Sequence, residues 1–130
     1  MKQYRFTYAQ KLHGKNLFTV VYQQGQRKNC GPILVVASPN QLAFNRMGLS
    51  ISRKVGNAVK RHRIKRLLRE AFRLTQNDLP TGYDLIVIVR PHPTLRLADY
   101  QRMLGDAINA LHLRWEKERK KQLKQENTQQ

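Results

Sequence analysis

The feature that most constrains this chain is a dense run of positive charge between Arg53 and Arg73. Nine of these twenty-one residues are lysine or arginine, and only one, Glu70, is acidic. Within the run, apolar residues recur from Ile64 at i, i+3, i+4, i+7 and i+8, the spacing of a helix that buries one face. The segment is therefore predicted to be an amphipathic helix whose outer face is strongly basic.

The rest of the composition also indicates an anionic partner. The 130 residues contain 25 Lys and Arg against 8 Asp and Glu, a formal net charge of +17. Such a surface repels itself unless an anion neutralises it, which disfavours an enzyme for small neutral substrates. No apolar run approaches the roughly twenty residues that a membrane-spanning helix needs. The single cysteine, Cys30, excludes an intrachain disulfide, so we expect no membrane partner and a cytoplasmic location.

A helical wheel with about 100° per residue separates the cations from the apolar stripe. His62, Arg63, Arg66, Arg69 and Arg73 fall opposite Ile64, with Lys65 at the edge. Lys60 and Arg61 fall nearer the apolar side, in the first turn, and are expected to extend past the sheet. Glu70 is expected to pair with Arg66 or Arg73 at helical spacing.

The ordinary interpretation of this face is a solvated helix surface. Solvated faces usually mix signs, because like charges at i, i+4 destabilise a helix by a few tenths of a kcal/mol each. A phosphate backbone would remove that repulsion and release its own counterions. We therefore favour nucleic-acid binding over a merely solvated face, and the predominance of arginine fits bidentate contacts to phosphate.

The hydrophobic pattern predicts the order helix, strands, helix, strand, helix, with a weaker signal for a strand before Cys30. This order indicates an α+β sandwich with helices packed on one sheet. Residues 1–115 are predicted to form a single α/β RNA-binding domain. Residues 116–130 are predicted to form a polar basic tail, which is either a helical extension or disordered. This tail would be either a second arm for RNA or a solubilising segment. The predicted elements are a helix over Asn16–Gln24 ended by Gly25, strands at Ile33–Ser38 and Met47–Ser52, the basic helix from an Asn57 N-cap to about Gln76, a central strand at Asp84–Arg90, and a helix beginning near Ala98 or Asp99.

No catalytic centre is apparent in the chain. Metal-dependent nucleases hold their cations with clustered carboxylates, whereas the eight acids here are scattered. His62 is the only histidine within the basic segment, and a phosphate or ribose contact is favoured over a general acid–base role. We assign no catalytic residue and identify no metal ligands.

The segment from Met47 to Arg73 resembles the protein subunit of bacterial ribonuclease P. The signature of that family is a helix with Arg-Asn-Arg inside a run of the form GNAV-x-RNR-IKR-xx-RE. The run from Gly56 to Glu70 matches it with one departure, because His62 stands in place of the central asparagine. The likeness covers roughly residues 11–115, including Phe18, Tyr22 and Gly25, the stretch 79–84, and Arg90-Pro91.

The resemblance implies a fold and an activity. The fold would be ribosomal-protein-S5-like, with about four strands and a left-handed βαβ crossover, although such crossovers are right-handed in about 98% of cases. The chain would be the non-catalytic protein subunit of a ribonucleoprotein endoribonuclease, whose chemistry the catalytic RNA performs with Mg²⁺. The holoenzyme would remove the 5′ leader of precursor tRNA, with one protein per RNA and no cofactor bound tightly by the protein.

The resemblance and the charge pattern together give two sets of candidate residues. Aromatic faces suit unstacked single-stranded bases, although Phe18 and Tyr22 would also serve to pack the first helix on the sheet. The leader surface is predicted to include Phe18, Tyr22, Val36, Ser50 and Ser52. The contacts to the catalytic RNA are predicted to be Arg53, Lys54, Lys60, Arg61, His62, Arg63, Lys65, Arg66, Arg69 and Arg73.

His62 is expected to retain RNA binding and to add a pH-dependent component, because histidine can carry a charge beside phosphate. Two alternative functions stay open: a ribosomal or general RNA-binding protein without a part in cleavage, and a self-sufficient nuclease that uses His62. The first fits the size and charge equally well, whereas the scattered carboxylates disfavour the second.

Overall fold

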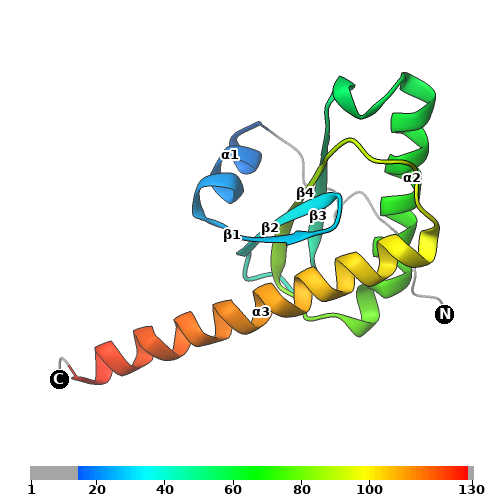
Figure 1. Cartoon of the computed structure of the whole chain (residues 1–130). Helices are drawn as coiled ribbons and strands as arrows, with labels where there is room; N and C mark the ends of the chain where they lie inside the picture. Colours follow the sequence, from blue (N-terminus) through cyan, green and yellow to red (C-terminus); the bar gives the residue numbers. More distant parts are fainter. Residues whose placement is uncertain (1–14, 129–130) are drawn as a thin grey trace.

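The computed structural model describes residues 15–128, which form one mixed four-stranded sheet and three helices (Figure 1). The first fourteen residues of the predicted domain and the last two of the tail lie outside this range. The order of elements confirms the prediction, and the weak signal before Cys30 is a full strand. The elements are α1 Lys15–Gln24, β1 Gln26–Cys30, β2 Ile33–Pro39, β3 Arg46–Ile51, the 3-10 turn η2 Arg53–Val55, α2 Ala58–Thr75, the 3-10 turn η3 Gln76–Asp78, β4 Tyr83–Val89 and α3 Leu97–Thr128.

The strands are arranged in the order β1-β2-β4-β3. β1 and β2 form an antiparallel hairpin, and Gly31 supplies the positive φ of 55° that its turn requires. β2 also pairs antiparallel with β4, whereas β3 and β4 are parallel neighbours joined through α2. This parallel pair with its connecting helix is the βαβ unit. β4 is central and almost wholly buried, as its continuous apolar sequence predicts.

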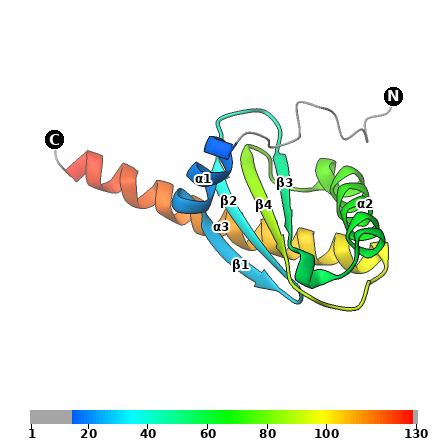
Figure 2. The same cartoon turned by 90° about the horizontal axis from the view of Figure 1, so that it is seen from above.

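The two faces of the sheet are covered unequally. Alternate strand residues, such as Leu85 and Val87 of β4, pack with α2 and α3 in a large hydrophobic core. Ile86 points to the other face, where it packs with Val36 and with Val21 of α1 in a much smaller cluster. Figure 2 shows α1 and α3 on opposite sides of the strands. The sheet is therefore thickly covered on one face and only partly covered on the other.

α2 begins where the sequence predicts. The Asn57 side chain accepts a hydrogen bond from the backbone N–H of Lys60 at 2.9 Å, which satisfies one amide of the first turn. Ile64, Leu68 and Phe72 are fully buried against the sheet and α3. Because the buried stripe fixes the rotation of the helix about its axis, the basic face has to point outward.

A hydrogen-bonded polar cluster lies at the start of β3 and β4. The Arg46 guanidinium donates two hydrogen bonds to the Asp84 carboxylate, both at 2.7 Å, and these bonds raise the pKa of Arg46. The Asn40 side-chain amide donates to the same carboxylate at 2.9 Å. Asp84, part of the sequence that resembles the ribonuclease P family, therefore joins β3 and β4 to the loop before β3.

α3 is 32 residues long and extends well beyond the body of the protein (Figure 1). Its last strong anchor is Trp115, whose indole N–H donates to the carbonyl of Ala37 at 2.9 Å. The described part of the predicted tail, residues 116–128, continues as helix. Over residues 15–128, no helix is both long enough and apolar enough to cross a membrane.

Candidate nucleic-acid interface

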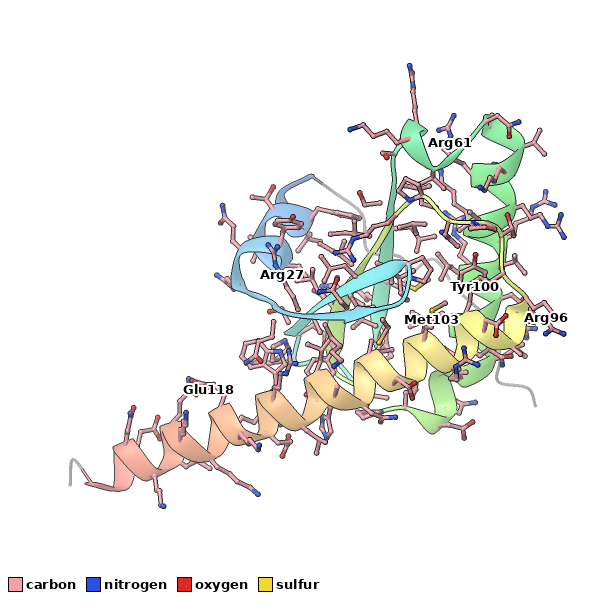
Figure 3. All side chains as sticks on the ribbon, viewed as in Figure 1. Arg27, Arg61, Arg96, Tyr100, Met103 and Glu118 are labelled. Carbon is pink, nitrogen blue, oxygen red and sulfur yellow. The ribbon has the colours of Figure 1, made fainter. Side chains whose placement is uncertain are left out.

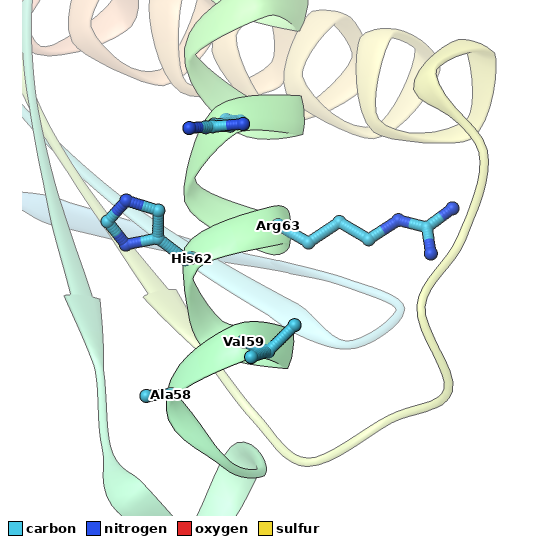
Figure 4. A pocket seen from close by; sticks show the side chains of 5 residues that line it. Ala58, Val59, His62 and Arg63 are labelled. Carbon is cyan, nitrogen blue, oxygen red and sulfur yellow. The ribbon is translucent and has the colours of Figure 1, made fainter.

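The outward face of α2 presents the cations that the helical wheel predicts. His62, Arg63, Arg66 and Arg69 are exposed, and Lys65 is half-buried at the edge of the face. Figure 4 shows the His62 and Arg63 side chains leaving opposite sides of the helix beside a shallow hollow, which Arg66 also lines. The face is therefore broad, and its charged groups can reach a ligand from more than one direction.

The first turn of α2 and the turn before it widen this face. Arg53 and Lys54 of η2 are exposed. Arg61 donates from Nε to the Gly56 carbonyl at 3.1 Å, which fixes its stem while the side chain remains only half-buried. The methylene groups of Lys60 lie over Gly56. As predicted, neither Lys60 nor Arg61 enters the core.

Glu70, the single acid in this region, pairs with Arg73. Arg73 donates from Nε to Glu70 at 3.0 Å, and a second guanidinium nitrogen bonds the other carboxylate oxygen. These hydrogen bonds hold the pKa of Glu70 below its ordinary value. Of the two partners that the sequence allowed, the structure uses Arg73, so the acid offsets a cation at the far end of the face, away from His62 and Arg63.

Arg90 is a cation that sequence reasoning missed. It is exposed directly after β4, and its backbone N–H donates to the carbonyl of Pro32 at 2.9 Å. Ile51 pairs with Val89 in the parallel ladder, so the ends of β3 and β4 lie side by side. Arg90 therefore lies at the same end of the sheet as Arg53 and Lys54 of η2, where β3 and β4 both finish. The signal that would have found it is the convergence of the carboxyl ends of parallel strands.

The outer surface of α1 has a different chemistry. Leu17, Val20 and Tyr22 are 39%, 44% and 44% exposed, and no charged residue occurs between Leu17 and Gln24. Phe18 is half-buried and packs on the cluster beneath the helix. A small helix with this much exposed apolar surface is typical of a contact site for another molecule.

The structure corrects one member of the predicted leader surface. Val36 is 0% exposed, because its side chain lies on the sheet face directly beneath α1. A leader nucleotide cannot touch it in this arrangement. Its apolar character supports α1 from below, which strand periodicity alone did not distinguish from a surface role.

Ser50 and Ser52 lie beside α1 and not beneath it. Ser50 pairs in register with Ile88, whose side chain packs on the α1 side of the sheet. Both serines are exposed, and Ser52 follows the end of β3. The uncovered part of this face therefore extends from α1 across β4 to β3 and ends beside the η2 cations.

Tyr22 has a cationic neighbour that the sequence did not indicate. The Arg27 guanidinium of β1 lies over the Tyr22 ring, 4.2 Å from its centroid. The same group donates to the Tyr22 carbonyl at 3.4 Å. Tyr22 is thus held in place by a cation–π contact while almost half of it stays exposed. Phe18 and Tyr22, taken together in the sequence, are separated by the structure into a packing residue and a surface residue.

Two other histidines are engaged elsewhere. His92 is hydrogen-bonded to the Tyr100 hydroxyl at 2.7 Å, and His112 to the Tyr83 hydroxyl at 2.8 Å. Within residues 15–128, no three histidine, cysteine, aspartate or glutamate residues are grouped closely enough to hold a metal ion. The thiol of Cys30 is partly buried, and its pKa is raised chiefly by that burial. The geometry therefore supports binding through cations and exposed apolar groups.

Comparison with known sequences gives a consistent result. Residues 6–113 match the protein family described as Ribonuclease P. The ribonuclease P protein component of Syntrophus aciditrophicus is 35% identical over 106 residues, which cover 81% of this chain and 89% of that protein. The corresponding protein of Desulfovibrio desulfuricans is 33% identical over 113 residues, covering 85% and 87% of the two chains.

Solved structures show the same likeness. The RNase P protein from Staphylococcus aureus has a TM-score of 0.68 and 28% identity, covering 78% of this chain and 94% of that one. The RNase P protein from Thermotoga maritima has a TM-score of 0.67 and 25% identity over the same shares. The α+β architecture described above is therefore that of these proteins.

Proposed function

The chain belongs to the ribonuclease P protein family, and on that premise we propose that it binds a catalytic RNA and the 5′ leader of precursor tRNA. In this role it assists endonucleolytic removal of the leader, which leaves the mature tRNA 5′ end. The observation that carries the proposal is the presence of two chemically different surfaces on one small domain. One is the cationic face of α2, and the other is the apolar surface of α1 with the adjoining open sheet.

The α2 face supports the first half of the proposal. Its arginines are planar donors that fit phosphate oxygens bidentately. The buried stripe of α2 holds these arginines on a rigid helix, so they form a preorganised surface for an RNA backbone. Binding there would release counterions and screen repulsion between two RNAs, which lowers the magnesium concentration needed for assembly.

The α1 surface supports the second half. A single strand exposes base faces, which stack on aromatic side chains with little sequence preference. Tyr22 offers such a ring, and Ser50 and Ser52 offer hydroxyl groups along the open strand. A protein that has to accept many different leaders needs contacts of this tolerant kind.

The chemistry itself belongs to the RNA in this proposal. Mg²⁺ held by the RNA would supply the charge stabilisation for phosphodiester hydrolysis. Residues 15–128 contain no grouped carboxylates of the kind that hold such an ion. The chain would contribute binding and orientation: α2 seats the protein on the catalytic RNA, and α1 holds the leader near the scissile bond. We place the complex in the cytoplasm, with one protein per RNA.

Reconstitution tests this function directly. The full chain is incubated with a precursor tRNA at low magnesium, with and without a bacterial ribonuclease P RNA. We expect cleavage at the 5′ end of the tRNA only when protein and RNA are both present. RNA binding without stimulation would indicate a general RNA-binding protein, and cleavage by the protein alone would indicate a self-sufficient nuclease. Either result would overturn the proposal.

A further inference from the structure

The part of α3 beyond Trp115 forms a projecting arm that the proposed function does not use. Figure 1 shows the arm leaving the domain, and Figure 3 shows side chains, among them that of Glu118, projecting from the arm. Lys117, Lys120, Lys121 and Lys124 are all exposed. These four residues are called the lysine stripe below.

The lysine stripe follows one side of the helix. Lys120, Lys121 and Lys124 follow Lys117 by three, four and seven residues, which places all four within an arc of about 100° on the helix. Like charges at these spacings destabilise a helix. The acids of the arm fall outside the stripe, and one of them, Glu116, pairs with Arg119 at 2.9 Å. The arrangement therefore presents a single sign of charge along one side of the arm.

The root of the arm is joined to the surface of α1. Arg114 lies one helical turn before Lys117 and donates to the Arg27 carbonyl at 2.6 Å. The Arg27 side chain in turn lies over Tyr22. Tyr22, Arg27 and Arg114 thus form a continuous path from α1, across the edge strand β1, to the start of the lysine stripe.

The root of the arm and the first turn of α2 lie at opposite ends of the sheet. Cys30 pairs with Ile33, and both Ile33 and Ile51 pair with Val89, so the hairpin tip is at the end where η2 and α2 begin. Trp115 contacts Ala37, which lies near the other end of β2. Figure 3 likewise shows Arg61 and Arg27 on separate parts of the molecule. One RNA contact on α2 therefore leaves the arm available to a different segment.

We propose that the lysine stripe binds the phosphate backbone of the 5′ leader, upstream of the nucleotides that stack on Tyr22. This inference rests on the proposed function and extends its leader surface. A leader that runs over Ser52 and Ser50 and past α1 reaches Tyr22 and Arg27, and the arm begins directly beside them. Lysines act as point charges for phosphate and do not select sequence, which suits a variable single strand.

The test compares two leader lengths in the reconstituted holoenzyme. Precursor tRNAs carry a leader of about 5 or about 15 nucleotides, which are close to the smallest and largest site sizes of single-strand-binding domains. The substitutions Lys120→Gln and Lys121→Gln are made together, because lysine and glutamine have similar helix propensities. Arg119→Gln with Gln122→Glu is the matched control, since it also lowers the net charge by two but alters the opposite side of the arm.

We expect the lysine variant to bind the long-leader substrate about fivefold more weakly, with a salt slope smaller by about 1.4 units, or 0.7 for each lost contact to a single strand. Its affinity for the short-leader substrate and the affinity of the control for both substrates should match the parent. Equal losses for both leaders would place the stripe on another part of the RNA and overturn the inference. Unchanged binding would make the stripe a solvated surface, with the same consequence.

Failure of the proposed function would look different. In that case the parent chain would not stimulate cleavage of either substrate. A parent that stimulates cleavage, combined with a lysine variant that shows no leader-length effect, would reject the arm contact and leave the proposed function intact. Far-ultraviolet circular dichroism of both variants verifies that the helix is retained.

Discussion

α1 and α2 lie on opposite faces of the same sheet and use their surfaces in opposite ways. α2 has 18 residues, of which Ile64, Leu68, Ala71 and Phe72 are buried, and its exposed side is cationic. α1 has ten residues, and of those whose side chains are described only Val21 is buried. Its exposed side is apolar and aromatic. α2 thus combines a structural and an electrostatic role, whereas α1 leaves much of its apolar surface uncovered.

This difference indicates which part of an RNA each helix suits. Cations on a rigid helix attract phosphates, and the attraction weakens with added salt. Exposed aromatic and aliphatic groups attract unstacked bases, and that contribution depends little on salt. We therefore predict that changes on α1 reduce RNA affinity strongly and independently of salt, whereas changes on the outside of α2 reduce it in a salt-dependent way. Changes beneath α2 should reduce folding stability most.

The largest effect is expected from removing a buried side chain of α2. Phe72→Ala should lower the free energy of unfolding by about 3–5 kcal/mol, because it leaves a cavity in the main core. Val21→Ala in the small cluster beneath α1 should cost only about 2 kcal/mol. Urea denaturation measures both. Equal losses would show that the two faces of the sheet contribute alike to stability, contrary to the comparison.

Removing the exposed ring of α1 should affect substrate more than folding. Tyr22→Ala is expected to weaken holoenzyme binding of precursor tRNA by about 1–3 kcal/mol, the usual contribution of one stacked base. Tyr22→Phe keeps the ring and should retain most of the affinity. The measurement is the equilibrium affinity of the holoenzyme for precursor tRNA and for the same tRNA without its leader. If the loss were the same for leaderless tRNA, Tyr22 would not be a leader contact.

Removing one cation from α2 should change the salt dependence. Arg66→Ala is expected to reduce the slope of log affinity for the catalytic RNA against log salt by about 0.9 units, which is one phosphate contact to a duplex. Arg102→Ala on α3 removes the same charge from an exposed residue that pairs with Asp99, and should leave the slope unchanged. Binding titrations of each variant with the catalytic RNA at several salt concentrations measure the slope. An unaltered slope for Arg66→Ala would mean that this face does not touch phosphate.

The smallest effect concerns His62. A protonated imidazole beside phosphate gains a charged hydrogen bond, so parent binding to the catalytic RNA should strengthen toward mildly acidic pH by about 1 kcal/mol or less. His62→Asn should lose that component while keeping a neutral contact. Affinities of the two proteins are measured from mildly acidic to alkaline pH. Parallel pH profiles would remove His62 from the set of groups that respond to phosphate.

The parts of the fold that sequence reasoning obtained are those governed by local periodicity. The stripe from Ile64 to Phe72 and the cap at Asn57 both lie where the pattern places them. The apolar run of β4 identified the central strand. β1 gave only a weak signal, because an edge strand of sequence QRKNC carries mostly polar residues and depends on its pairing with β2.

The candidate site was predictable only in part, for a related reason. The cations of α2 follow from one wheel, since a helix whose apolar side is buried has one direction left for its charges. The burial of Val36 could not be predicted, because strand alternation identifies a face of the sheet but not which helix covers it. The positions of Arg90 and Arg27 became evident only from the tertiary structure. Arg90 lies near the η2 cations because β3 and β4 pair in parallel, and Arg27 reaches the Tyr22 ring across the turn between α1 and β1.

The sequence by itself determined that this chain folds around an amphipathic basic helix and that its net charge favours a polyanionic partner. Both follow from the composition and spacing of residues near one another in the chain. Only the tertiary structure decided which apolar residues stay exposed, which cations share an edge, and where the lysine stripe begins. Those properties depend on strand order and on the unequal covering of the two sheet faces, which arise from contacts between residues far apart in sequence.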